Sequence, residues 1–219
     1  MWAVEIIYVP WSKALEYCYK LAVKILDSDI DPDVVIAISR GGLVPARIVS
    51  DILAVDELFT VRAKLWGVGG RLFNEPQASI PNPGIVADKK VLIIDEVVDT
   101  GATMKKIVEN TKKAGAREVV TGVLHYKSTS SFKPDFYVEK VEKWVWIFYP
   151  WSFSETLYGL AIKRGEDIVK QAFNILKEVG ATELYIDPLS VAKSIEKYVS
   201  ASIRENPPLK QQQSSQYPF

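Results

Sequence analysis

The chain has 219 residues, of which 48% are hydrophobic and 25% are charged, and this composition predicts a globular protein with a sizeable buried core. Its 27 Lys and Arg residues balance 27 Asp and Glu residues, so no net charge attracts nucleic acid or an anionic membrane. The single cysteine, Cys18, excludes an intramolecular disulfide, and no apolar run reaches the roughly 20 residues of a spanning helix. We therefore expect a cytoplasmic protein with no nucleic-acid or membrane partner.

Apolar residues three and four apart predict helices, and short apolar runs rich in β-branched residues predict strands. The predicted helices of the first part of the chain are Lys13–Leu26, Leu43–Leu53 and Ala102–Ala114. The predicted strands are Asp33–Ile38, Phe59–Trp66, Lys90–Ile94, Val119–Tyr126, Asp135–Val138 and Trp144–Phe148. This alternation predicts an α/β fold with a mainly parallel sheet, helices on both faces, and ligands at the carboxyl ends of the strands.

The remaining segments differ in character. Gly67–Asp88 holds four Gly and three Pro without a clear period, which predicts a mobile functional loop. We expect its part Gly67–Pro83 to close over the site through residues such as Arg71 or Phe73. After Ser152 the spacing predicts three helices, namely Ser154–Lys163, Glu166–Val179 and Pro188–Val199. We therefore divide the chain into a core of residues 1–152, a helical C-terminal extension of residues 153–205 and a polar tail of residues 206–219, rich in Pro, Gln and Ser.

The segment Val91–Met104, VLIIDEVVDTGATM, carries the clearest chemistry. A hydrophobic strand leads to two adjacent acids, Asp95 and Glu96, whose carboxylates accept hydrogen bonds as a sugar diol would require. The residues Asp99, Thr100, Gly101, Ala102 and Thr103 then lead into a helix. Backbone N–H groups at such a glycine turn form an anion pocket, and the absence of Gly-Lys-Ser/Thr excludes a P-loop.

This segment resembles the signature with which type I phosphoribosyltransferases bind phosphoribosyl pyrophosphate (PRPP), and the resemblance spans roughly residues 1–152. It implies the α/β fold of that family, with a small hood that covers the base. By resemblance, Asp95 and Glu96 bind the ribose hydroxyls together with Mg²⁺, which PRPP brings with it, and Asp99–Thr103 holds the 5′-phosphate. The family also implies a homodimer.

A second motif, ISRGGLVP at Ile38–Pro45, is similar to the pyrophosphate loop of xanthine-guanine and hypoxanthine-guanine transferases. Glycine lets the backbone approach a ligand closely, and an arginine pairs with phosphate oxygens. The resemblance therefore implies that Ser39, Arg40 and Gly41 bind pyrophosphate, with a non-proline cis peptide bond between Ser39 and Arg40.

Three regions concern the base. In 6-oxopurine transferases an aspartate in the phosphate loop acts as general acid/base at N7 of the purine, and Asp99 matches it. Lys127 matches the donor to O6, although on its own it could be a solvated surface lysine. Trp146 matches the residue that stacks on the purine, and Ile147 matches the residue that offers backbone groups. For the other tryptophans of this segment, Trp144 and Trp151, we expect core packing, and the only histidine, His125, is assigned no role.

The sequence departs from the family at Ser152, where an acid normally receives the 2-amino group of guanine. This departure weakens guanine and xanthine as substrates. We expect a purine salvage enzyme that transfers the phosphoribosyl group to N9 of a hypoxanthine-type base. One alternative is an adenine phosphoribosyltransferase on a 6-oxopurine-type scaffold. An alternative of another class is a regulator that senses PRPP or purines. Orotate or uracil transferases share the PRPP loop, but Lys127 and the tryptophan segment fit a purine better.

Overall fold

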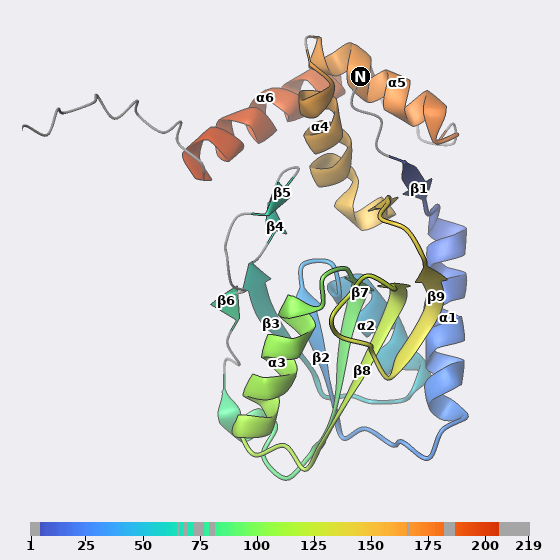
Figure 1. The fold of residues 1–219 in the computed structure, drawn as a ribbon, viewed down its shortest axis with the longest axis vertical. Helices are drawn as coiled ribbons and strands as arrows, with labels where there is room; N and C mark the ends of the chain where they lie inside the picture. The colour runs from blue at the N-terminus through green and yellow to red at the C-terminus, as the bar shows by residue number, and fades with distance from the viewer. Residues whose placement is uncertain are drawn as a thin grey trace, which may run out of the picture. The chain divides into compact units, whose positions relative to one another are not determined.

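A computed structural model describes residues 5–64, 66–67, 70–71, 77–78, 82–165, 167–181 and 187–205 (Figure 1). The chain divides into two compact units, of which the first ends at Phe153 and the second begins at Ser154. The predicted site residues all belong to the first unit. Within the described ranges, no helix is long and apolar enough to cross a membrane.

The centre of the first unit is a six-stranded sheet with the strand order β6-β3-β2-β7-β8-β9. The strands pair in parallel, except that β6 is antiparallel to β3. The strands in chain order are β2 (Val34–Ser39), β3 (Leu58–Lys64), β6 (Gln77–Ala78), β7 (Lys90–Val98), β8 (Glu118–Lys127) and β9 (Phe136–Val141). Because β2, β7 and β8 are parallel neighbours, their carboxyl ends lie at one edge of the sheet.

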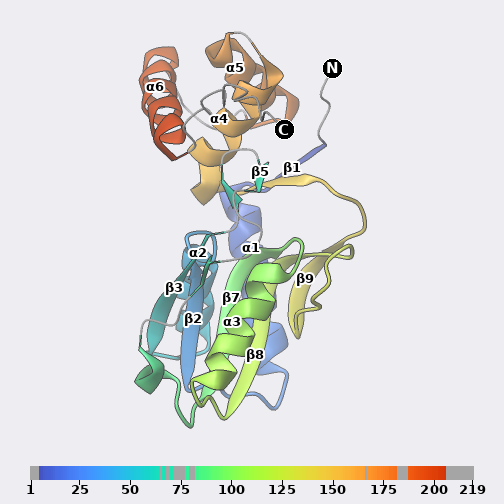
Figure 2. The same ribbon diagram turned by 60° about the vertical axis from the view of Figure 1, so that its left-hand side comes forward.

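Helices cover both faces of this sheet (Figures 1 and 2). On β7, the buried Leu92 belongs to a core cluster with residues of α1 (Trp11–Leu26) and α2 (Leu43–Ile52). The next residue, Ile93, is also buried and belongs to a second cluster with residues of α3 (Ala102–Lys113). Alternate side chains of a strand point to opposite faces, so a continuous apolar run is what a doubly covered strand requires.

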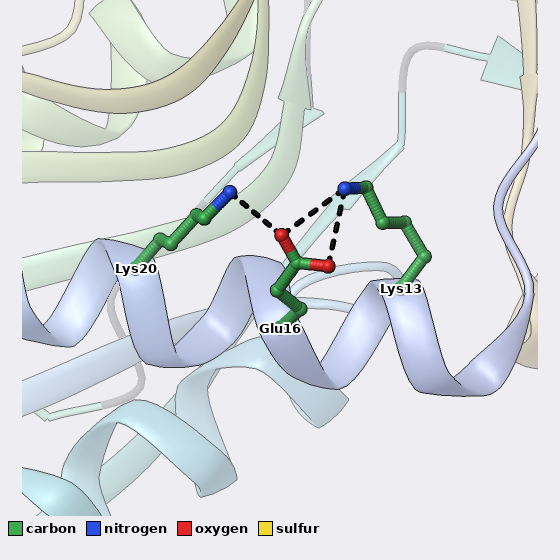
Figure 3. Close-up of polar contacts among 3 residues, drawn as sticks. All are labelled: Lys13, Glu16 and Lys20. Carbon is green, nitrogen blue, oxygen red and sulfur yellow. Dashed lines mark hydrogen bonds and ion pairs between the residues drawn. The ribbon is translucent and has the colours of Figure 1, made fainter.

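Helix α1 is buried along one side and polar along part of the other. Its buried positions are Ala14, Tyr17, Cys18, Leu21, Ala22 and Ile25, a helical spacing. On the outer side the Glu16 carboxylate lies 2.6 Å from Lys20 Nζ and 3.1 Å from Lys13 Nζ (Figure 3). These two ammonium groups, Lys20 first, lower the pKa of Glu16. Exposed ion pairs contribute little stability, so the apolar side attaches the helix to the sheet.

A separate pair of short strands lies beyond the main sheet. Strand β1 (Ile6–Tyr8) pairs in parallel with β10 (Trp146–Phe148), and Ile7 lies opposite Ile147. A 3-10 turn, Pro150–Ser152, follows β10. We call this two-stranded sheet and residues 144–152 the hood. Elsewhere in the first unit, β4 (Trp66–Gly67) pairs with β5 (Gly70–Arg71), and a 3-10 turn spans Pro83–Ile85.

The predicted α/β fold with a mainly parallel sheet is confirmed. Several predicted boundaries are wrong, and the one that bears on the site is the end of β7. This strand does not end at Ile94 but continues to Val98, because Asp95 and Val98 still pair with Val123 and Tyr126 of β8. In the same way, β9 ends at Val141 rather than Val138, and α6 (Pro188–Glu205) ends at Glu205 rather than Val199. The short strand β1 was not predicted. Phe73 and the side chain of Arg71, the predicted closing residues of the loop, lie outside the described residues.

The second unit contains α4 (Phe153–Arg164), α5 (Ile168–Glu178) and α6 (Pro188–Glu205). Two hydrogen bonds of 2.8 Å join the Arg164 guanidinium to the Glu178 carboxylate and connect the ends of α4 and α5. The Tyr158 ring packs edge-on against Tyr198 of α6. The three predicted helices are therefore present, and the predicted polar tail at 206–219 lies outside the described residues.

Candidate active site

The predicted pyrophosphate turn and the acid pair lie in contact at the carboxyl edge of the sheet. Strand β2 ends at Ser39 beside β7, with Ala37 opposite Ile94. A Cβ atom built at Gly41 would lie 2.5 Å from Cδ of Glu96, and one built at Gly42 would lie 2.5 Å from the Ile94 carbonyl oxygen. No larger residue fits either position without movement of these neighbours, so the two glycines let the turn approach the acids.

The turn itself has the predicted cis peptide bond between Ser39 and Arg40. Ser39 Oγ donates to the carbonyl oxygen of Val61 at 3.1 Å, which ties the turn to β3. The N–H of Gly42 donates to the Ile38 carbonyl oxygen at 2.8 Å, and α2 begins directly afterwards at Leu43. The turn therefore presents its backbone and the exposed Arg40 at the end of β2.

The two acids of the pair have different surroundings. Burial raises the pKa of Asp95 well above its usual range, and the neighbouring Glu96 carboxylate raises it further. Asp95 Oδ1 accepts a hydrogen bond of 2.8 Å from the backbone N–H of Glu96, which only partly offsets these effects. The Glu96 carboxylate accepts a hydrogen bond from Nε1 of Trp151. Burial and the neighbouring carboxylate thus both disfavour the charged form of Asp95, and a cation or a ribose diol bound beside it would compensate that charge.

The predicted phosphate loop connects β7 to α3. Gly101 has a φ of +83°, and a Cβ atom there would lie 2.5 Å from Ser130 Oγ and 2.6 Å from Phe132 Cβ. The backbone N–H and the hydroxyl of Ser131 both donate to the Thr100 carbonyl oxygen, at 3.1 and 3.0 Å. The loop is thus held from its outer side by residues 130–132. The N-terminus of α3 follows at Ala102, and helix N-termini favour bound phosphate.

Lys127 and Asp99, two residues predicted to contact the base, meet in the structure. Lys127 Nζ lies 3.1 Å from Asp99 Oδ1, and the two side chains are only 6% and 20% exposed. The alternative of a solvated surface lysine is therefore wrong. The same ammonium lies 4.9 Å from the centre of the Trp144 ring, a cation–π contact. Trp144 is 45% exposed, so the expectation that it packs in the core is also wrong.

The other predicted base residues belong to the hood. The half-buried Trp146 ring packs edge-on against Trp144, with 6.3 Å between ring centres, and the side chain of Ile147 is buried. The Ser152 hydroxyl donates to the Tyr149 carbonyl oxygen at 3.2 Å. Trp151 packs against the buried core, as expected, while its indole N–H reaches Glu96.

Two buried residues near the acids were not identified from the sequence. Tyr149 is 1% exposed, and its hydroxyl donates to the Glu96 carbonyl oxygen at 2.9 Å. His125 Nδ1 lies 2.6 Å from the same hydroxyl. Burial lowers the pKa of His125 to about 4, with a smaller effect of Lys127, so the ring is neutral near pH 7. The alternation of β8 indicates only that positions 125 and 127 share a face, and no motif marks the tyrosine as its partner.

Magnesium fits this edge as an ion shared with the substrate. In the part of the chain that the structure describes, no three His, Cys, Asp or Glu side chains gather closely enough to hold a metal ion. Mg²⁺ commonly binds one or two carboxylates together with substrate phosphates, and Asp95 and Glu96 offer that donor set. The ion would neutralise phosphate charge and orient the ligand.

Comparison with known proteins identifies the family. The family model described as phosphoribosyl transferase domain matches residues 8–156. The chain belongs to this family. A xanthine-guanine phosphoribosyltransferase of Cereibacter sphaeroides is 30% identical over 124 residues, which cover 55% of this chain and 69% of the relative. The predicted family and enzyme class are thereby confirmed.

Solved structures agree with this assignment. A purine phosphoribosyltransferase from Pyrococcus horikoshii is 36% identical, with a TM-score of 0.57 over 67% of this chain and 93% of that one. A hypothetical protein from Neisseria gonorrhoeae with bound ppGpp is 27% identical, with a TM-score of 0.60 over 82% of this phosphoribosyltransferase chain and 99% of its own. Both structural alignments cover nearly the whole length of the matched chains.

Proposed function

We propose that this phosphoribosyltransferase transfers the phosphoribosyl group of PRPP to N9 of a purine, with a hypoxanthine-type base as its preferred acceptor. The observation that carries the proposal is the ion pair between Lys127 and Asp99, beside the acid pair at the edge of the sheet. A lysine only donates hydrogen bonds and suits an oxo group, whereas an exocyclic amine offers it mainly donors. The purine and xanthine-guanine transferases among the relatives support a purine.

In the reaction, N9 of the base forms a bond to C1′ of the ribose while the bond from C1′ to the pyrophosphate oxygen breaks, and pyrophosphate leaves with the electron pair. We assign the ribose hydroxyls to Asp95 and Glu96, and the 5′-phosphate to Asp99, Thr100, Gly101, Ala102 and Thr103. Ser39, Arg40 and Gly41 would hold the pyrophosphate, with Mg²⁺ neutralising its charge.

The base would lie between the hood and the Lys127–Asp99 pair. The Asp99 carboxylate would take the proton from N7 as N9 attacks, and Lys127 would donate to O6. Trp146 would stack on the purine, which contributes about 1–3 kcal/mol per base. Ile147 would offer its backbone groups, and Ser152 would border the 2-position. Ser152 offers a 2-amino group only a neutral hydroxyl oxygen as acceptor, which is weaker than the carboxylate that the family has at this position.

The test is a panel of hypoxanthine, guanine, xanthine and adenine with PRPP and Mg²⁺, followed by pyrophosphate release. We expect the highest kcat/KM with hypoxanthine. Highest activity with adenine would instead establish the adenine transferase on a 6-oxopurine-type scaffold. Absence of turnover with every base, while PRPP still binds, would establish the regulator that senses PRPP or purines.

The remaining assignments concern the whole protein. We propose a cytoplasmic homodimer without a nucleic-acid or membrane partner. We also propose that residues 1–152 form the catalytic core with its hood, 153–205 a helical extension and 206–219 a polar tail. Sedimentation velocity of the full chain tests the dimer, and a sedimentation coefficient of a monomer at micromolar concentration would contradict it.

A further inference from the structure

We infer that Trp151 is a positioning residue, whose indole N–H holds the Glu96 carboxylate in the orientation that receives PRPP. The inference rests on the proposed function, because it assumes that Glu96 contacts the ribose hydroxyls or their Mg²⁺. Glu96 belongs to β7 of the main sheet, whereas Trp151 belongs to the hood. The hood would therefore organise the PRPP site as well as cover the base.

The first support is that two hood residues donate hydrogen bonds to Glu96, one to its side-chain carboxylate and one to its backbone carbonyl oxygen. Trp151 Nε1 donates to the Glu96 carboxylate, and the Tyr149 hydroxyl donates to the Glu96 carbonyl oxygen at 2.9 Å. The Tyr149 and Trp151 rings are stacked, with 5.0 Å between centres and 13° between planes. The carboxylate and the carbonyl oxygen of Glu96 are therefore each bonded to one of two rings that pack against each other.

The second support is that Tyr149 is itself held firmly. It is fully buried, and its hydroxyl donates to the Glu96 carbonyl oxygen. Its oxygen lies 2.6 Å from His125 Nδ1. Since the Tyr149 proton is directed at Glu96, the neutral His125 ring must carry its proton on Nδ1 and donate it to Tyr149. The His125 ring also packs edge-on against Tyr17, with 5.1 Å between centres.

The third support is the position of the carboxylate over the pyrophosphate turn. The Cδ and Oε1 atoms of Glu96 lie 2.5 and 2.6 Å from where a Cβ of Gly41 would stand. The carboxylate is therefore placed between the Trp151 indole and the turn that is proposed to bind pyrophosphate. A long carboxylate side chain has several rotamers, and a charge-assisted hydrogen bond to one oxygen selects among them.

The experiment compares Trp151→Phe with Trp11→Phe in the full-length protein. Phenylalanine at 151 keeps an aromatic ring beside Tyr149 but removes the N–H donor to Glu96 together with part of the indole's packing surface, and Trp11→Phe makes the same loss of ring size without that donor. Trp11 is a matched control, because it is 55% exposed and packs edge-on against Trp151 at 5.8 Å. A hydrogen bond to a charged group typically corresponds to about tenfold in affinity. We expect W151F to raise the KM for PRPP about tenfold and to leave the KM for the base nearly unchanged. W11F should change neither.

Glu96→Ala separates the inference from the proposed function on which it rests. If E96A raises the KM for PRPP and the double variant W151F/E96A behaves like E96A, then Trp151 acts through Glu96. If E96A raises this KM but W151F does not, the inference is overturned and the function stands. If E96A leaves the KM for PRPP unchanged, Glu96 does not bind PRPP. This result would overturn the role assigned to Glu96 under the proposed function and, with it, the inference.

Tyr149→Phe provides a second measurement should W151F unfold at the assay temperature. It removes only the hydroxyl that joins His125 to the Glu96 carbonyl oxygen. We expect the same rise in the KM for PRPP, with the base KM unchanged. A folded Y149F protein in which the two KM values rise together, or in which neither rises, would overturn the inference.

Discussion

The ammonium of Lys127 and the carboxylate of Asp99 form an ion pair of 3.1 Å at the ends of neighbouring strands. Both side chains are largely buried, so each charge depends on the other for compensation. In the proposed function, a purine beside this pair would meet a donor and an acceptor that are already fixed in place. The pair is therefore the feature through which base recognition and proton transfer are most directly tested.

Asp99→Asn tests the proton transfer. Asparagine keeps the shape of the side chain but cannot accept the N7 proton as a carboxylate does, and general acid/base groups contribute about 100- to 10,000-fold to rates. We expect kcat to fall within that range, measured by pyrophosphate release. Asp51→Asn removes an exposed carboxylate that pairs with Arg47 and should leave kcat unchanged. An unchanged kcat in D99N would remove Asp99 as the acid/base group.

Lys127→Gln tests the choice of base. The amide offers an acceptor as well as a donor, so an exocyclic amine gains a partner that lysine does not provide. We expect the ratio of kcat/KM for hypoxanthine to that for adenine to fall about tenfold. Lys140→Gln, at an exposed lysine paired with Glu142, should leave the ratio unchanged. If the ratio in K127Q equals that of the parent, Lys127 does not read the 6-position.

The sequence predicted those parts of the site that lie within single segments. The acids, the glycine turn and the start of α3 follow one another between residues 95 and 103, so local rules for strands, turns and helix starts position them. The end of β7 was misplaced because the acids Asp95 and Glu96 interrupt the apolar run. Pairing with β8, which a single segment does not reveal, extends the strand through them.

Contacts between distant segments were not predictable in the same way. Tyr149 and Trp151 lie 53 and 55 residues from Glu96 in the chain. Only the packing of the hood determines that they meet it. The aromatic run 144–151 fits core packing and base stacking equally well as a pattern. Trp144 shows the difficulty, because it was expected in the core and instead covers Lys127 at the surface.

Asp95→Asn tests whether the buried carboxylate of Asp95 destabilises the folded protein. Because burial and Glu96 raise the pKa of Asp95, folding favours its protonated form, and stability is lost as pH rises through the folded pKa. The neutral variant escapes this loss. We expect D95N to lose activity but to unfold at a higher temperature at pH 7.5, by about 2–4 °C per kcal/mol gained. The difference in Tm should shrink towards pH 4. A lower Tm for D95N at pH 7.5 would contradict the argument.

Gly41→Ala tests the contact between the turn and the acid pair. The new methyl group would lie 2.5 Å from Cδ of Glu96, so this carboxylate or the turn must move. We expect the KM for PRPP to rise at least about tenfold. A shift of about 1 Å in a group that positions a substrate can reduce an enzyme's activity about 100-fold. Gly84→Ala is the control, because its nearest neighbour is the Asn82 side chain at 3.2 Å. Equal KM values for PRPP in G41A and G84A would show that Gly41 does not contribute to PRPP binding.

His125→Asn tests the buried histidine through its pH dependence. The folded pKa of about 4 lies below the ordinary value of 6.5, so the unfolded chain binds the extra proton first, and stability falls as pH falls between these values. At about 1.36 kcal/mol per pKa unit, this shift corresponds to roughly 3 kcal/mol of stability. Asparagine can still donate to the Tyr149 hydroxyl but does not titrate. Because asparagine loses the packing of the imidazole ring against Tyr17, urea unfolding should show the parent more stable than H125N at pH 7. This advantage should shrink towards pH 4, because only the parent titrates. An advantage that stays constant over this range would show that His125 is not the titrating group.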